Sequence, residues 1–311
     1  MAQIYVGTCS WTDPTLLASG FYPSGVNTPE KRLVYYAEHF PIVEVDSTYY
    51  ALPAERNAAL WVKRTPAHFV FNIKAFALFT QHPTPVNALP KNVREALGDR
   101  VEKANLYHKD LPGELLDLVW EMFKSALLPL DSAGKLGAIL FQFPQWVFPS
   151  HDNFEHILTC QERLGQYRMA VEFRNGVWLD EKHRDETLKF LRRNDLIYVA
   201  VDEPQGFRSS VPPVPEATTD LSIVRLHGRN RENWEKKGIS VAERFRYLYS
   251  REELQEWAPR IERQASQTRN MHVLFNNCYG DYAVRNAQDM AGMLRTLGLD
   301  VMETHKEPAT R

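Results

Sequence analysis

Short apolar runs rich in β-branched and aromatic residues recur along the chain, and polar residues bound each of them. Runs of this length and composition are typical of buried β-strands. We expect eight strands, at residues 4–8, 42–48, 69–75, 137–143, 168–174, 197–203, 221–228 and 271–277.

Stretches with apolar residues at helical spacing separate most of these strands. Thr28 followed by Pro29 is typical of a helix start, and Ser250 followed by Glu253 is a capping-box pattern. The pattern predicts helices at residues 28–40, 113–128, 185–195, 250–267 and 283–298.

The repeated alternation of strand and helix predicts an α/β fold with a parallel sheet. Eight units in 311 residues match a TIM (β/α)8 barrel, which typically needs about 250 residues. The main rival is a doubly wound sheet, but no G-x-G-x-x-G fingerprint follows the first strand. We expect a single domain over residues 1–311, with a long irregular insertion at 76–112 after the third strand and a proline-rich loop at 204–220.

Composition narrows the classes of function. The formal net charge is −2, so no basic excess points to sequence-independent nucleic-acid binding. No apolar run approaches the roughly 20 residues of a membrane helix, and the N-terminus lacks a signal-peptide pattern. Cys9, Cys160 and Cys278 are far apart and odd in number, so we expect a reduced, cytoplasmic protein without a membrane partner.

Pairs of polar residues at positions i and i+2 lie near the carboxyl ends of four expected strands. Such residues share one face of a strand, and an outward charge would meet the apolar face of a covering helix at a cost of order several kcal/mol. We therefore expect them at the C-terminal mouth of the barrel, where active sites of this fold lie. The pairs are Glu44 and Asp46, Asn72 and Lys74, Glu172 and Arg174, and Arg225 and His227.

The acidic members of this set suit proton transfer. Glu44, Asp46 and Glu172, together with Asp202 at the end of the sixth strand, are candidate general acids or bases. His227 titrates closest to neutral pH and is the expected proton carrier. The same carboxylates suit Mg²⁺ or Mn²⁺, so a divalent metal stays open as a cofactor.

The cationic and amide members suit a small anionic ligand, because arginine and lysine recognise phosphate and carboxylate groups. Asparagines at the end of the last strand would orient such a ligand, and aromatic residues that follow strands would stack on a ring. The expected binding residues are Lys74, Arg174, Arg225, Asn276, Asn277, Trp11 and Tyr49.

An internal salt-bridge network is the alternative reading of the same residues, with pairs such as Glu44–Lys74 and Glu172–Arg174. Buried ion pairs are a poor way to gain stability, which favours a functional site for the ring as a whole.

Nine motifs that occur in order along most of the chain resemble the domain of unknown function 72 family, the YecE-like proteins. They are GTCSW, FYP, VEVDSTYY, LFQFP, VEFRNGVW, VDEP, RLHGRN, RYLYSREELQEW and FNNCYGDYAVRNA. The resemblance implies a TIM barrel without an established activity, a relationship to the endonuclease IV and xylose isomerase barrels, and nucleic-acid binding as one proposal. Asp46 stands where the family usually has an asparagine-like position, and the strand ends lack the histidine metal ligands of the endonuclease IV relatives. The resemblance carries over Glu44, Asp46, Lys74, Glu172, Arg174, Asp202, Arg225, His227, Asn276 and Asn277.

We expect an enzyme that acts on a small phosphate- or carboxylate-bearing substrate at the barrel mouth by acid–base chemistry. Two alternatives stay open, a divalent-metal hydrolase and a nucleic-acid-binding or processing protein. In the second alternative, basic residues of the insertion would clamp a nucleic-acid backbone. These residues are Lys91, Arg94, Arg100, Lys103 and Lys109.

Overall fold

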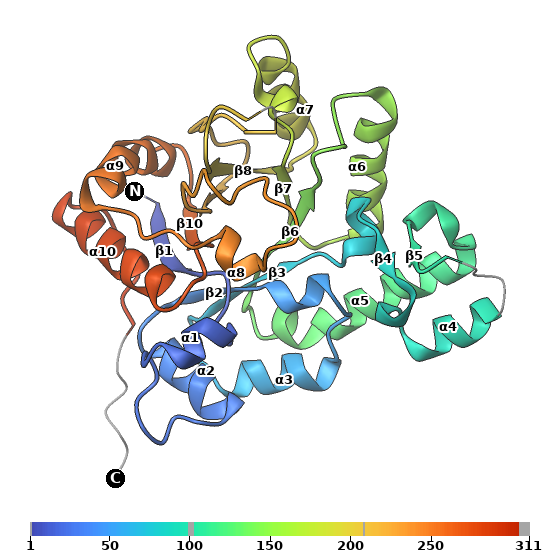
Figure 1. Ribbon diagram of the computed structural model, residues 1–311, viewed down its shortest axis with the longest axis horizontal. Coiled ribbons are helices and arrows are strands. Elements are labelled where there is room, and N and C mark those ends of the chain that lie inside the picture. The colour runs from blue at the N-terminus through green and yellow to red at the C-terminus, as the bar shows by residue number, and fades with distance from the viewer. Residues whose placement is uncertain (1, 99–102, 208, 305–311) are drawn as a thin grey trace.

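The computed structural model describes residues 2–98, 103–207 and 209–304, and within them parallel strands close into a barrel that helices surround (Figure 1). The order around the barrel is β1-β10-β9-β8-β7-β6-β3-β2. This confirms the TIM (β/α)8 architecture. The barrel strands are β1 (Gln3–Thr8), β2 (Ile42–Val45), β3 (Val70–Lys74), β6 (Leu136–Phe143), β7 (Met169–Phe173), β8 (Ile197–Asp202), β9 (Leu221–Leu226) and β10 (Asn270–Phe275).

Helices cover the outside of the barrel. Thr28 caps α2 by accepting the N–H of Lys31, and Ser250 and Glu253 form the expected capping box of α9. The pattern did not predict α1, α3, α4, α6 and α8. The helices are α1 (Pro14–Ala18), α2 (Pro29–Ala37), α3 (Glu55–Lys63), α4 (Lys91–Leu97), α5 (Gly113–Ser132), α6 (His151–Leu164), α7 (Arg184–Arg193), α8 (Val241–Arg244), α9 (Arg251–Ala265) and α10 (Tyr282–Thr296).

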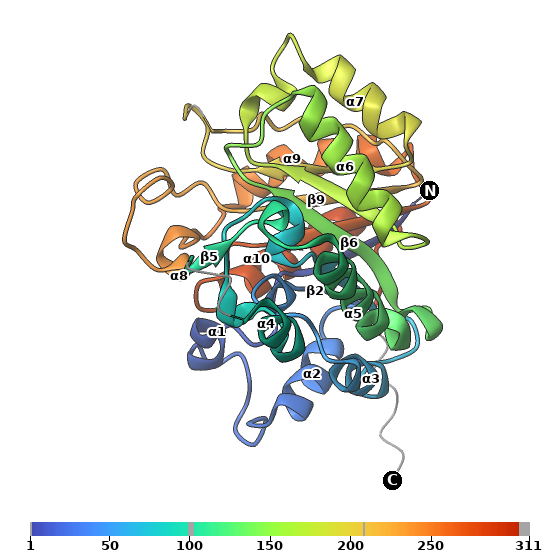
Figure 2. The same cartoon turned by 90° about the vertical axis from the view of Figure 1, so that its right-hand side faces the viewer.

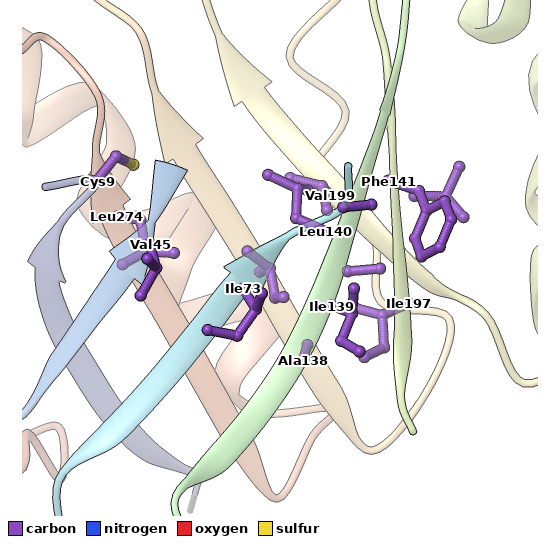
Figure 3. Packing of buried hydrophobic residues seen from close by; sticks show 14 of the residues in the cluster. Cys9, Val45, Ile73, Ala138, Ile139, Leu140, Phe141, Ile197, Val199 and Leu274 are labelled. Atoms are coloured by element: carbon purple, nitrogen blue, oxygen red, sulfur yellow. The ribbon is translucent and has the colours of Figure 1, made fainter. Parts of the chain in front are cut away.

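Apolar side chains from all parts of the barrel form one buried core. Figure 3 shows part of this packing, in which Val45, Ile73, Leu140, Val199 and Leu274 come from five different strands. All five are at most 1% exposed, so the strands are sealed from water along most of their length.

The second strand is shorter than the expected residues 42–48. It ends at Val45, and Asp46–Tyr49 form a 3-10 turn, η1. The Thr48 hydroxyl lies 2.9 Å from the carbonyl oxygen of Val45 and 2.6 Å from that of Lys74. Because this side chain binds the backbone locally, it favours a turn over continued strand pairing.

The insertion after β3 has more regular structure than we expected for residues 76–112. A short antiparallel ladder joins β4 (Thr84–Pro85) to β5 (Asn105–Leu106), and α4 packs against α5. Val93 and Leu97 of α4 are buried in the same apolar core as the barrel residues, so the insertion packs onto the rest of the domain. In Figure 2, β5 and α8 lie at the end of the barrel opposite the N-terminus.

The three cysteines are free thiols, two of them buried. Among residues 2–98, 103–207 and 209–304, the helices include none with the length and apolar character that a membrane crossing requires.

Two glycines give a test of how closely β1 and β2 approach. A Cβ on Gly7 would lie 2.2 Å from the carbonyl oxygen of Ile42, whereas a Cβ on Gly292 in α10 would meet nothing within 4 Å. We expect Gly7→Ala to lower the free energy of unfolding by about 1–3 kcal/mol or more, because backbone must move. Gly292→Ala is the matched control and should raise it by about 0.5–1 kcal/mol through helix propensity. Urea denaturation measures both, and a neutral Gly7→Ala would contradict this close approach.

Candidate functional site

A fully buried arginine on β9 joins three strands inside the barrel. Arg225 donates from Nη1 to Glu172 Oε2 on β7 and from Nη2 to Glu44 Oε1 on β2, each at 2.5 Å. All three side chains are at most 1% exposed. The inward orientation that we inferred for these residues from strand alternation therefore places them in contact.

One guanidinium serves two carboxylates, and the two differ in pKa. Burial raises the pKa of Glu44 to about 7, although Arg225 opposes the shift. The Oε2 atom of Glu44 has no hydrogen-bond partner among the residues that the structure describes. Burial also acts on Glu172, but the charge of Arg225 and a hydrogen bond from His227 hold its pKa well below the usual range. Glu172 is therefore the ionised partner of Arg225 over the physiological pH range, whereas Glu44 changes its protonation state near neutral pH.

Glu172 is the centre of further hydrogen bonds. Its Oε1 accepts from Gln142 Nε2 at 2.6 Å and from His227 Nε2 at 3.2 Å, and Arg174 Nη1 lies 3.6 Å away. This arrangement fixes the ionised carboxylate from several strands at once.

His227 is oriented from both sides of its ring. Asn276 Nδ2 donates to Nδ1 at 2.9 Å, so the ring proton lies on Nε2 and is donated to Glu172. Burial, with the charge of Arg174, lowers the pKa of His227 to about 3. The ring is therefore neutral at physiological pH, because a buried site disfavours the charged imidazolium form. This differs from our expectation that His227 titrates near neutral pH.

A cavity of about 740 Å³ opens above this buried network, at the carboxyl ends of β6, β7 and β8. Of the residues that we expected to bind or transform a ligand, Tyr49 and Arg174 line it. The full lining is Tyr49, His82, Gln142, Pro144, Gln145, Trp146, Arg174, Glu203, Ser209, Trp234, Glu235, Lys236, Lys237 and Arg244.

Of the two adjacent acids at the end of β8, Glu203 rather than Asp202 lines the cavity. Glu203 accepts from Arg174 Nη1 and from the backbone N–H of Val211, each at 2.7 Å. Burial raises its pKa to about 7 against the influence of Arg174 and Val211. Asp202 faces the other side of the sheet, where it accepts from Arg229 Nε at 3.0 Å and from the Tyr249 hydroxyl at 2.6 Å.

Lys74 pairs with Asp46 and not with Glu44, which is its partner in the alternative salt-bridge reading of the sequence. The Lys74 ammonium lies 3.6 Å from the Asp46 carboxylate and 4.9 Å from the centre of the Tyr49 ring. The 3-10 turn after Val45 brings Asp46 to this position, so Glu44 is left to Arg225.

Trp11 and Asn277 lie away from the cavity. The Trp11 ring packs edge-on against Trp61 of α3 at 5.8 Å. Asn277 donates to the carbonyl oxygen of Tyr247 at 2.8 Å and to Asn286 Oδ1 at 2.9 Å, which joins α10 to the loop before α9. Both contacts are internal packing of the protein rather than contacts with a ligand cavity.

The long segment between β9 and α9 supplies cavity residues that the sequence patterns did not identify. Trp234 lies over the Arg174 guanidinium at 5.1 Å, and Lys236 and Lys237 extend the basic lining. Arg244 donates to the carbonyl oxygens of Trp234 and Lys236, which fixes the conformation of the segment. These residues follow no strand end directly, so only their position in the fold brings them to the mouth.

His82 of the insertion also lines the cavity. The buried Thr80 hydroxyl lies 3.2 Å from the Ala77 carbonyl oxygen and 2.9 Å from His82 Nδ1. Since the carbonyl only accepts, both bonds form when His82 carries its proton on Nδ1. Burial, Lys74 and Arg174 lower the pKa of His82 to about 3, so Nε2 is an unprotonated acceptor at neutral pH.

The carboxylates do not fit the metal site that we considered. Glu44 and Glu172 both bind Arg225, and Asp202 faces away from them. In the part of the chain that the structure describes, no group of three or more His, Cys, Asp or Glu side chains is arranged to hold a metal ion.

The basic residues of the insertion are partly neutralised by neighbouring acids. Lys103 lies 2.8 Å from Asp110, and Lys91 lies 3.6 Å from Glu95. Arg100 lies outside the described residues. Nucleic-acid clamping by this segment remains a prediction from sequence.

The fold and the mouth together define a TIM-like α/β barrel with a buried charge network under an open basic cavity. The chain belongs to the family described as "Protein of unknown function DUF72", which matches residues 5–311. It is 32% identical over 296 residues to the UPF0759 protein YunF of Bacillus subtilis (strain 168), covering 94% of this chain and 95% of that protein.

Crystal structures of two family members share this fold. A DUF72 family protein from Thermotoga maritima MSB8 has a TM-score of 0.74 and 30% identity, over 94% of this chain and 99% of that one. A DUF72 family protein from Enterococcus faecalis V583 has a TM-score of 0.77 and 24% identity, over 98% and 99% of the two chains. The family resemblance read from the motifs is therefore confirmed.

The unequal carboxylates of Arg225 give a second test. At pH 6 we expect Glu172→Gln to lower the free energy of unfolding by about 3–5 kcal/mol, because it removes the ionised partner of a buried charge. Glu44→Gln should cost about 1 kcal/mol or less at that pH, since Glu44 is already mostly protonated there.

The sign of the pH dependence follows from the raised pKa of Glu44. Its contribution to stability is complete below the unfolded pKa of about 4.5 and is lost as the pH rises through about 7. As the pH rises from 6 to 8, the free energy of unfolding of the wild type should therefore fall relative to that of Glu44→Gln. Urea denaturation at each pH measures this difference. Equal losses for the two variants at pH 6 would show that Arg225 holds both carboxylates alike.

Proposed function

We propose that the protein is an enzyme that binds a small phosphate- or carboxylate-bearing substrate in the mouth cavity and transforms it by acid–base chemistry. The pairing of Arg174 with Glu203 in the cavity wall carries this proposal. It joins an anion-binding group to a carboxyl group whose pKa is about 7.

The charge of the cavity supports an anionic substrate. Its lining has more cations than carboxylates, and Arg174 offers a fork of donors that matches phosphate and carboxylate groups. The cations are Arg174, Lys236, Lys237 and Arg244, and the carboxylates are Glu203 and Glu235.

Glu203 supports the acid–base part of the proposal. A general acid or base works best when its pKa lies near the operating pH, and burial brings Glu203 to this range. Glu44 has a similar pKa but is fully buried and does not line the cavity. We assign proton transfer to Glu203 and positioning of Arg174 to Glu172, which lies 3.6 Å from it.

An incoming anion would compete with Glu203 for Arg174, because Glu203 already occupies one of the Arg174 donors. Protonation of Glu203 below pH 7 frees Arg174 for an incoming anion. We expect the affinity for sulfate, which does not titrate in this range, to rise by up to about tenfold from pH 8 to pH 6. Isothermal titration calorimetry at several pH values measures this change.

Two variants and a control make this test specific. Arg174→Ala should weaken sulfate binding at pH 6 at least about tenfold, as expected for a charge-assisted hydrogen bond, and Arg174→Lys should retain part of it. Glu203→Gln should remove the pH dependence and leave the affinity near its low-pH value. Arg246→Ala, an exposed charge outside the cavity, should bind as the wild type does. Unchanged binding by a folded Arg174→Ala would contradict an anion site here.

Turnover distinguishes an enzyme from a binding protein. We expect the wild type to convert at least one member of a panel of phosphorylated and carboxylated metabolites followed by ¹H and ³¹P NMR. Glu203→Gln should slow this conversion by about 10²–10⁴-fold, the usual contribution of a general acid or base, while it still binds sulfate. Binding without conversion across the panel would contradict an enzyme, and equal rates would remove Glu203 from proton transfer.

A further inference from the structure

An exposed tryptophan lies between two cavities at the mouth of the barrel. Trp146, in the loop after β6, is 49% exposed, whereas most aromatic side chains in the described residues are buried in the core. It lines the mouth cavity and also a second cavity of about 320 Å³. A ligand held by Arg174 in the first cavity would reach the second cavity along this ring.

The Trp146 side chain is held in place despite its exposure. Its indole Nε1 donates to the carbonyl oxygen of Gln81 at 3.2 Å. Gln81 adopts a left-handed conformation with φ of 61°, which L-residues avoid, and its side chain donates to Asn153 Oδ1 at 3.0 Å. Asn153 in turn donates to the carbonyl oxygen of Phe148 at 2.8 Å, in the same loop as Trp146.

This arrangement keeps an apolar face turned toward solvent in a fixed orientation. Leaving the face of a large aromatic residue in water forfeits the free energy of burying it. An unfavourable backbone conformation that helps to fix such a side chain is a feature of binding sites. A rigid aromatic face beside a basic cavity suits a ring attached to an anion.

His82 indicates what kind of ring the ligand has. Its ring centre lies 5.7 Å from that of Trp146 and 5.2 Å from that of Tyr49. Since Nδ1–H is donated to Thr80, Nε2 accepts hydrogen bonds, and no described residue donates one to it. In a cavity otherwise rich in cationic donors, this acceptor suits a hydroxyl group on the ligand.

The second cavity offers room and polar groups beyond the ring. It is lined by Gln81, Tyr107, His108, Lys109 and Trp146. A second polar group of the ligand would meet the polar side chains of Gln81, Tyr107 or Lys109 there.

We propose that the ligand is a phosphorylated sugar, free or as part of a nucleotide. Its phosphate binds Arg174, its hydroxylated ring lies on Trp146 with a hydroxyl donated to His82, and any further group enters the cavity beside Tyr107 and His108. This inference rests on the proposed function, because it assigns the substrate class of the same mouth cavity.

The test compares probes that add one part of the ligand at a time. Calorimetry at pH 6 measures the affinity for inorganic phosphate, cyclohexyl phosphate, ribose 5-phosphate and adenosine monophosphate. We expect ribose 5-phosphate to bind about tenfold or more tightly than both inorganic phosphate and cyclohexyl phosphate, because only its ring has hydroxyl groups for His82. Tighter binding of adenosine monophosphate than of ribose 5-phosphate would assign the sugar to a nucleotide, and equal binding would assign it to a free sugar phosphate.

Variants of Trp146 and His82 test whether these residues give the higher affinity for ribose 5-phosphate. Trp146→Ala should lower the affinity for ribose 5-phosphate about tenfold and leave inorganic phosphate unchanged, while Trp146→Phe should retain most of the affinity. His82→Phe should remove the preference for ribose 5-phosphate over cyclohexyl phosphate. Phe148→Ala is the matched control, because Phe148 is exposed in the same loop but lines neither cavity.

The outcomes separate this inference from the proposed function. If inorganic phosphate binds and Arg174→Ala abolishes that binding, but the sugar adds no affinity, the sugar phosphate is excluded and the anion site stands. If neither sulfate nor any of these phosphates binds, the anion site in the mouth cavity fails, and the proposed function fails with it. If Phe148→Ala and Trp146→Ala have equal effects, the gain does not come from the Trp146 ring.

Discussion

The mouth of this barrel depends on one buried guanidinium that must satisfy two carboxylates from distant parts of the chain. Arg225 in the seventh barrel strand of the sequence binds Glu44 from the second and Glu172 from the fifth. An isolated charge cannot remain in this interior, so each partner is tolerable only when the others are in place. The closed barrel therefore depends on a complete charge network. Glu172 in turn contacts Arg174 and His227 and so helps to fix the positions of both side chains.

Strand alternation was sufficient to predict the inner part of the site. Glu44, Glu172 and Arg225 lie near strand ends at inward positions, and the structure brings them into contact. Alternation failed for Asp202 because the sequence does not show which of two adjacent acids faces inward. The register does: Asp202 pairs with Leu226, the outward neighbour of Arg225, so Asp202 also faces outward and Glu203 inward. Such register is a property of the closed sheet and leaves no local sequence signal.

The outer part of the site could not be predicted from local patterns for a different reason. Trp146, Trp234 and Lys236 belong to loops, and only the paths of those loops place them over the mouth. In the sequence, nothing sets these residues apart from tryptophans and lysines elsewhere in the chain. Their contribution depends on contacts far along the chain, such as the bond from Trp146 to Gln81, across 65 positions. Trp11 is the converse case, since it follows a strand directly but packs beneath α3.

If the cavity binds anions as we propose, the bond between Arg174 and Glu203 gives it a threshold as well as a charge. While the two remain paired, the donor fork of Arg174 is already neutralised by a carboxylate. A weakly basic, singly charged ion such as chloride would then gain too little to open the pair. A multiply charged group would bring enough attraction to replace the carboxylate, and Glu203 would take up a proton as it is released. In a medium crowded with small anions, the pair would thus select ligands by charge density and would re-form each time the ligand leaves.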